Sequence, residues 1–170
     1  RGKDDCKYIL DTYRALAEQK PKQRAVIVYD SMWGSTGIMA SAIASGLEDE
    51  GVPVRIIDIQ KNHHSDVMTE LADCGAVIVG SATHNNNVLP GIADVLTYMK
   101  GLRPLNRVGA AFGSYGWSGE SPKIIQEWLA SMNMDMPADP VKCLFVPKHE
   151  GLSQCVALGK TVAEALKAKC

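Results

Sequence analysis

Three polar segments of this sequence have residues that could bind a ligand, and each of them follows a short apolar run. They are residues 30–37 (DSMWGSTG), 81–87 (SATHNNN) and 113–119 (GSYGWSG). All three are rich in Gly, Ser, Thr or Asn, so they offer hydroxyl, amide and backbone N–H donors. Neutral donors of this kind suit a phosphate monoester that stays bound better than a triphosphate that is transferred.

The first segment is the candidate phosphate cradle. Ser31, Ser35 and Thr36 supply hydroxyls, and Gly34 allows the backbone to approach a ligand closely. A helix that starts here directs free N–H groups and its positive dipole end at an anion. The patterns GxxxxGK[ST] and GxGxxG are absent, which excludes the common triphosphate and dinucleotide loops. The alternative interpretation is a helix start that is merely capped by Ser or Thr.

Aromatic side chains in these loops favour a planar ligand. Tyr115 and Trp117 flank Gly116 in the third segment, and Trp33 lies in the first. A ring such as isoalloxazine needs aromatic or apolar walls, with backbone groups at its polar edge. A ligand such as flavin mononucleotide (FMN) would meet both requirements, although these aromatics could instead pack a loop against the core. His84 could contact the pyrimidine edge of a flavin or lie on the surface.

The elements that would position these loops alternate along the chain. Short apolar, partly β-branched runs predict strands at residues 25–29, 54–59, 76–80, 108–112 and 143–146. Helical periodicity predicts helices at residues 38–50, 66–71, 92–99, 124–132 and 156–166, with Trp128 in the core. This alternation predicts a doubly wound parallel α/β sheet, in which ligands bind beyond the carboxyl ends of the strands. An additional short amphipathic helix is expected between Tyr8 and Leu16.

Composition also limits the classes of function that this sequence allows. The 170 residues fit one domain, and their net charge of −1 lacks the positive bias of a nucleic-acid-binding protein. No apolar run is long enough for a membrane span, and no signal peptide is evident. The five cysteines have no CxxC spacing, so we expect free thiols in a cytoplasmic protein and no metal site.

Three longer motifs resemble a known family. Residues 29–36 (YDSMWGST), 80–90 (GSATHNNNVLP) and 112–120 (FGSYGWSGE) look like the FMN site of flavodoxin-like domains, and more narrowly that of flavodiiron proteins (A-type flavoproteins). The resemblance covers roughly residues 24–168 and implies a five-stranded sheet in the order 2-1-3-4-5 with non-covalent FMN. It implies that the phosphate is held by the first loop, at Ser31, Met32, Trp33, Gly34, Ser35 and Thr36. It implies that the isoalloxazine is wrapped by Ala82, Thr83, His84, Asn85, Asn86, Ser114, Tyr115, Gly116, Trp117, Ser118 and Gly119.

One departure from that family limits what this chain can do alone. Flavodiiron proteins carry a His-x-Glu-x-Asp-His iron motif in a preceding domain, and the four histidines here have no such spacing. The resemblance thus implies an electron-transfer domain at residues 23–170, with residues 1–22 as a connector from a preceding domain. Electrons would come from a rubredoxin-like or other reductase partner and leave for the di-iron domain, which reduces O2 or NO.

Two other functions fit the same fold class. One is an NAD(P)H-dependent quinone or flavin reductase, for which the sequence shows no obvious nicotinamide pocket. The other is a receiver-like binding module, which needs an acidic cluster after the first strand. Asp30 is the only acidic residue in the first loop, so this last interpretation is disfavoured.

Overall fold

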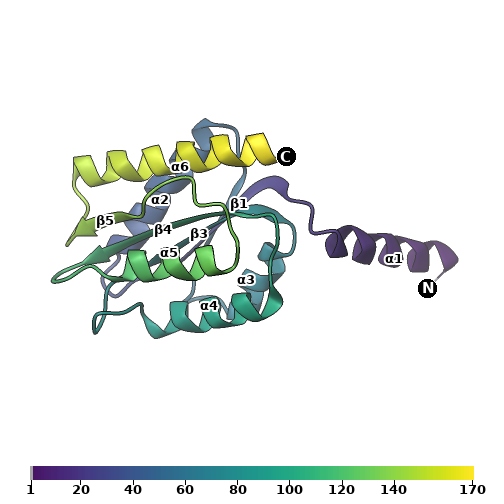
Figure 1. The fold of residues 1–170 in the computed structure, drawn as a ribbon, viewed down its shortest axis with the longest axis horizontal. Coiled ribbons are helices and arrows are strands. Elements are labelled where there is room, and N and C mark those ends of the chain that lie inside the picture. The colour runs from purple at the N-terminus through teal and green to yellow at the C-terminus, as the bar shows by residue number, and fades with distance from the viewer. Residues whose placement is uncertain (1) are drawn as a thin grey trace.

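A computed structural model describes residues 2–170 of the protein. A single parallel sheet forms its centre (Figure 1). Its strands lie in the order β2-β1-β3-β4-β5, which confirms the predicted topology. They are β1 (Lys22–Asp30), β2 (Val54–Asp58), β3 (Cys74–Ser81), β4 (Val108–Tyr115) and β5 (Val141–Leu144). The chain passes from β1 to β2 on one side, and then crosses back to β3 on the other side of β1. Strand order therefore reverses between β1 and β3.

Helices cover both faces of this sheet. The covering helices are α2 (Ser35–Asp49), α3 (His64–Leu71), α4 (Pro90–Leu102), α5 (Ser121–Ser131) and α6 (His149–Lys169), and a further helix, α1 (Lys3–Ala17), precedes β1. Apolar residues of α2 and α6 pack on one face, and those of α3, α4 and α5 pack on the other. The central strand β3 is buried along its whole length, which explains why its sequence is continuously apolar.

Two glycines bring α2 and α6 into backbone contact. A Cβ atom added at Gly46 would lie 2.2 Å from the carbonyl oxygen of Val156, and one at Gly159 would lie 2.3 Å from that of Ile43. Only glycine permits an approach this close. The contact fixes the position of α2, whose first turn belongs to the candidate phosphate cradle.

Several predicted boundaries were wrong for identifiable reasons. The last strand spans 141–144 rather than 143–146, because Phe145 adopts a left-handed conformation that ends it. The last helix begins at His149 rather than 156, since its first turns are too polar to show a periodic apolar face. Trp128 is only half-buried at the margin of the core, with the Lys100 ammonium 5.2 Å from its ring centre.

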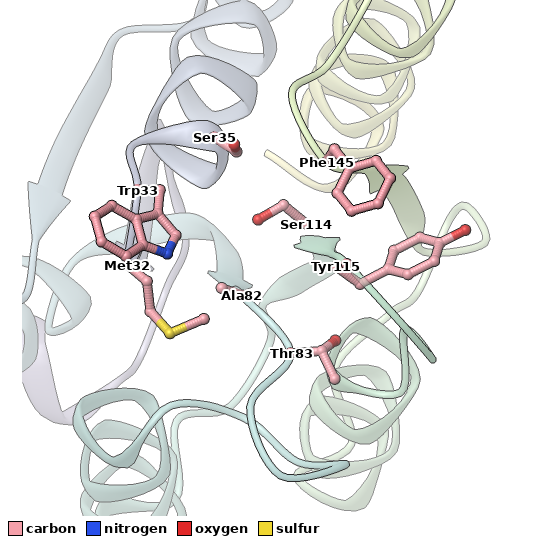
Figure 2. A pocket seen from close by; sticks show the side chains of 9 residues that line it. Met32, Trp33, Ser35, Ala82, Thr83, Ser114, Tyr115 and Phe145 are labelled. Atoms are coloured by element: carbon pink, nitrogen blue, oxygen red, sulfur yellow. The ribbon is translucent and has the colours of Figure 1, made fainter.

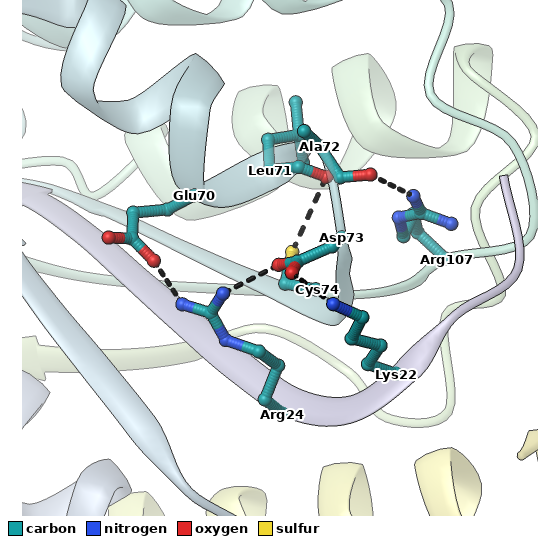
Figure 3. Close-up of polar contacts among 8 residues, drawn as sticks. All are labelled: Lys22, Arg24, Glu70, Leu71, Ala72, Asp73, Cys74 and Arg107. Carbon is teal, nitrogen blue, oxygen red and sulfur yellow. Dashed lines mark hydrogen bonds and ion pairs between the residues drawn. The ribbon is translucent and has the colours of Figure 1, made fainter. Parts of the chain in front are cut away.

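The amino-terminal edge of the sheet is held by charges. Lys22 pairs with Asp73 at 2.6 Å, and Arg24 pairs with both Asp73 and Glu70 (Figure 3). Burial opposes the charge on Asp73, but its two basic partners outweigh that effect and lower its pKa. This cluster fixes the start of β1 against the turn between α3 and β3.

Helix α1 projects from the layered body of the protein (Figure 1). Its side chains from residue 5 to residue 17 are exposed, including those of Tyr8 and Tyr13. The segment after α1 is anchored by the buried guanidinium of Arg107, which donates to the carbonyl oxygens of Gln19 (3.0 Å), Leu105 (2.6 Å) and Ala72 (3.3 Å). The guanidinium therefore fixes the position of the segment that connects α1 to β1.

Candidate functional site

A cavity of about 300 Å³ lies where the carboxyl ends of β1, β3 and β4 meet. This volume is at the lower end of the range for small-molecule sites. Figure 2 shows the side chains around it. The cavity is lined by Met32, Trp33, Ser35, Ala82, Thr83, Ser114, Tyr115, Gly116 and Phe145. All but Phe145 belong to the predicted site, so the fold brings the three predicted loops together.

The first turn of α2 offers unpaired donors to this cavity. Its N-cap is Gly34, which has a φ of +84° and cannot cap with a side chain, and no side chain of the described residues caps the helix in its place. No acidic residue lies in the first turn. The first N–H groups and the positive end of the helix dipole thus stay available to an anion. The alternative interpretation of a side-chain-capped helix does not fit this geometry.

The hydroxyl of Ser31, four residues before the start of α2, is a second candidate hydrogen-bond donor. Its Oγ atom is buried and has no hydrogen-bond partner in the described part of the chain. An unsatisfied buried hydroxyl is costly, and natural proteins usually satisfy such groups with water or a ligand. The hydroxyl, the uncapped helix start and the neutral loop together fit a phosphate ester such as that of FMN.

Hydrogen bonds beneath the cavity hold its floor. Thr36 and Ser114 join α2 to β4 through their hydroxyls at 2.9 Å, and both side chains are buried. The backbone N–H of Thr83 donates to the carbonyl oxygen of Ser114 at 2.9 Å, and its hydroxyl contacts that of Ser121 at 2.9 Å. The predicted residue Thr36 thus supports the floor and is absent from the lining.

The walls of the cavity are aromatic on two sides. Figure 2 shows Trp33 and Met32 on one side, and Tyr115 and Phe145 on the other. Trp33 is 91% exposed, so the indole is free of core contacts. None of the described residues that line the cavity carries a charge. Such a neutral slot suits the planar ring of a flavin.

The remaining predicted residues belong to the second and third loops but do not line the cavity. Asn85 and Asn86 both have positive φ and form a tight turn that is closed by backbone bonds between His84 and Asn87. Ser118 Oγ donates to Asn86 at 3.3 Å, which links the second and third loops. Their predicted flavin contacts stay predictions, as do those of Trp117, which is 96% exposed, and Gly119.

Two features of the site were not predicted. Phe145 lines the cavity from the turn after β5. Asp30 is buried at the end of β1, and Gln60 donates from its side-chain amide to the Asp30 carboxylate (2.8 Å) and to the Ser31 carbonyl (2.7 Å). These two bonds hold the start of the first predicted loop. The only sequence signal was the position of Gln60 directly after the second predicted strand.

The fold and cavity define a doubly wound α/β domain with a ligand site at its topological switch point. The flavodoxin family matches residues 27–159, and the chain belongs to this family, whose members bind FMN.

The relatives are longer proteins. Over 169 residues the chain is 52% identical to rubredoxin-oxygen oxidoreductase of Megalodesulfovibrio gigas, covering 99% of this chain and 42% of that protein. A solved structure of rubredoxin oxygen:oxidoreductase from Desulfovibrio gigas superposes with a TM-score of 0.96, covering 99% of this chain and 42% of that one. A nitric oxide reductase of Moorella thermoacetica is 41% identical over 91% of this chain and 39% of its own.

A solved flavodiiron protein from Giardia intestinalis is 28% identical, with a TM-score of 0.90 over all of this chain and 42% of its own. The resemblance to flavodiiron proteins is thereby confirmed, and the chain spans about two fifths of the length of these relatives.

The described part of the chain lacks two further kinds of feature. None of the described helices is long and apolar enough to cross a membrane. Within residues 2–170, no group of three or more His, Cys, Asp or Glu side chains is placed to hold a metal ion.

Proposed function

We propose that this chain is the FMN-binding electron-transfer domain of a flavodiiron-type oxidoreductase. The observation that carries the proposal is the neutral, partly aromatic cavity at the switch point, which the uncapped start of α2 borders at Ser35. The buried Ser31 hydroxyl, next in the chain to the lining residue Met32, has no partner in the described part of the chain. Bound FMN would supply the redox chemistry itself.

The chain's own residues bind and orient that group. The loop from Ser31 to Thr36 holds the phosphate through neutral hydroxyl and backbone donors, and the dipole of α2 favours its negative charge. Trp33 and Tyr115 exclude water from the faces of the ring. Among the described residues, no carboxylate, histidine, lysine or arginine lines the cavity, so the lining orients a flavin through neutral groups.

The wider role belongs to a longer protein. Electrons would arrive from a rubredoxin-like or other reductase partner and leave for a di-iron domain that reduces O2 or NO. The names of the relatives that are oxygen and nitric oxide reductases support this proposal. In the same proposal, residues 1–22 connect the FMN domain to a preceding domain, and α1 projects in a manner suited to that role. Free cysteines throughout the described chain suit the cytoplasm.

A flavin titration tests the proposal. Native protein should quench the fluorescence of one equivalent of FMN and bind riboflavin, which lacks the phosphate, more weakly. Ser31→Ala should weaken FMN binding about tenfold, the value of one hydrogen bond to a charged group, and leave riboflavin binding unchanged.

Ser45→Ala is the matched control, because the Ser45 hydroxyl is exposed and bonds only within α2. The control should bind both flavins normally. A native protein that binds neither flavin would refute the proposal.

A further inference from the structure

Phe145 has a backbone conformation that its residue type does not favour. Its φ is +57°, in the left-handed region where a side chain crowds the backbone. The other non-glycine residues of the described chain with positive φ are all polar: Gln19, Asn85, Asn86, Arg103, Asn106 and Asn133. An aromatic residue held in this way is an outlier that needs a reason.

The core does not supply that reason. The Phe145 side chain is 64% exposed, and its neighbours Leu144 and Val146 are exposed as well. A ring with so little burial contributes little to folding. The turn is nevertheless firmly held, because the Phe145 backbone N–H donates to the carbonyl oxygen of Tyr115 at 2.7 Å.

The cavity does supply a reason. The ring of Phe145 lies against the third loop, where a Cβ atom added at Gly116 would be 3.4 Å from it. Figure 2 shows the ring at the cavity, across from Trp33. The left-handed turn is therefore what directs this side chain to the ligand slot instead of along the edge strand β5.

We propose that Phe145 is a positioning residue for the flavin ring, and that the strained turn after β5 is retained because it places this wall. The inference rests on the proposed FMN-binding function and extends the site beyond the three loops. It predicts that the ring of Phe145 contributes to ligand binding while its backbone conformation opposes folding.

Two substitutions separate these effects. Phe145→Gly and Phe145→Ala both remove the ring, but only glycine relieves the left-handed strain. Both variants should bind FMN and riboflavin about tenfold more weakly and by the same factor, as expected for a lost ring contact worth about 1.4 kcal/mol. Without ligand, Phe145→Gly should unfold at a urea concentration at least as high as the native protein, and clearly higher than Phe145→Ala. Phe145→Tyr should retain native affinity.

Arg103→Gly is the matched control, because Arg103 has a φ of +51° at the end of α4, away from the cavity. This control should gain stability and bind both flavins as the native protein does. The inference is overturned if Phe145→Gly binds flavin like the native protein, or if it loses as much stability as Phe145→Ala. A native protein that binds no flavin would instead refute the proposed function, so the two failures are distinguishable.

Discussion

The contact between α2 and α6 gives a prediction whose sign opposes ordinary helix propensity. Gly46→Ala should gain about 1 kcal/mol from helix propensity alone. However, the new Cβ atom would lie 2.2 Å from the backbone carbonyl oxygen of Val156, which cannot rotate away. Overpacking costs about 1–3 kcal/mol, and an obstacle made of backbone favours the upper end. We therefore expect a net loss of about 2 kcal/mol, or about 4–8 °C in Tm for a protein of this size.

Gly101→Ala is the control for this prediction. Gly101 lies in α4, and nothing stands within 4 Å of the Cβ atom that would be added. This variant should be stabilised by up to about 1 kcal/mol. Urea unfolding followed by far-ultraviolet circular dichroism measures both variants. If Gly46→Ala proved as stable as the native protein, α2 and α6 could not be in the backbone contact described above. Because α2 begins at the phosphate cradle, Gly46→Ala should also weaken FMN binding.

Three further predictions follow from buried or paired groups. Arg107→Leu should lower the free energy of unfolding by about 3 kcal/mol, because three carbonyl oxygens lose their donor. Trypsin should then cut faster after Lys22, while FMN binding stays native. Unchanged proteolysis would contradict the anchoring role of Arg107. Burial raises the pKa of the Cys74 and Cys155 thiols to about 12, so at pH 8 a thiol reagent should modify rapidly only the two exposed cysteines, Cys6 and Cys170, and should reach all five in denaturant. The pKa of Asp73 is lowered in the folded state, so its ion pairs stabilise the protein above the ordinary carboxyl pKa, and this contribution is lost as pH falls through the folded-state pKa. Asp73→Asn should therefore reduce stability by about 1 kcal/mol at pH 7 and show a smaller acid-induced loss than the native protein; parallel pH profiles would contradict the pairing.

The three loops could be predicted from sequence because their signal is local. Each follows a short, continuous apolar run, which is typical of a strand buried on both faces, and each has the small polar residues of a ligand loop. Parallel strands then place their carboxyl ends at one edge, so loops far apart in sequence meet without further information. This is why eight predicted residues line the same cavity.

The missed features depend on contacts that no local pattern records. Residues 143–146 are apolar and look like a strand throughout, so only the left-handed turn at Phe145 reveals that the strand stops and the ring enters the site. The bond from Gln60 to Asp30 joins the loop after β2 to the end of β1, and its existence depends on the pairing of these strands in the sheet. The apolar runs are visible in the sequence, but a turn conformation that is set by contacts with distant segments of the same chain is not.

The location of the flavin site is tested most directly by amide chemical shifts. Native, isotope-labelled protein would be titrated with FMN, and its backbone N–H resonances followed by two-dimensional NMR. We predict the largest shifts at residues 31–37, with further shifts at Thr83, Gly116 and Phe145, and little change at the opposite edge around Arg107. Shifts centred on that opposite edge, or no shifts at one equivalent of FMN, would contradict the assignment of the phosphate to the start of α2.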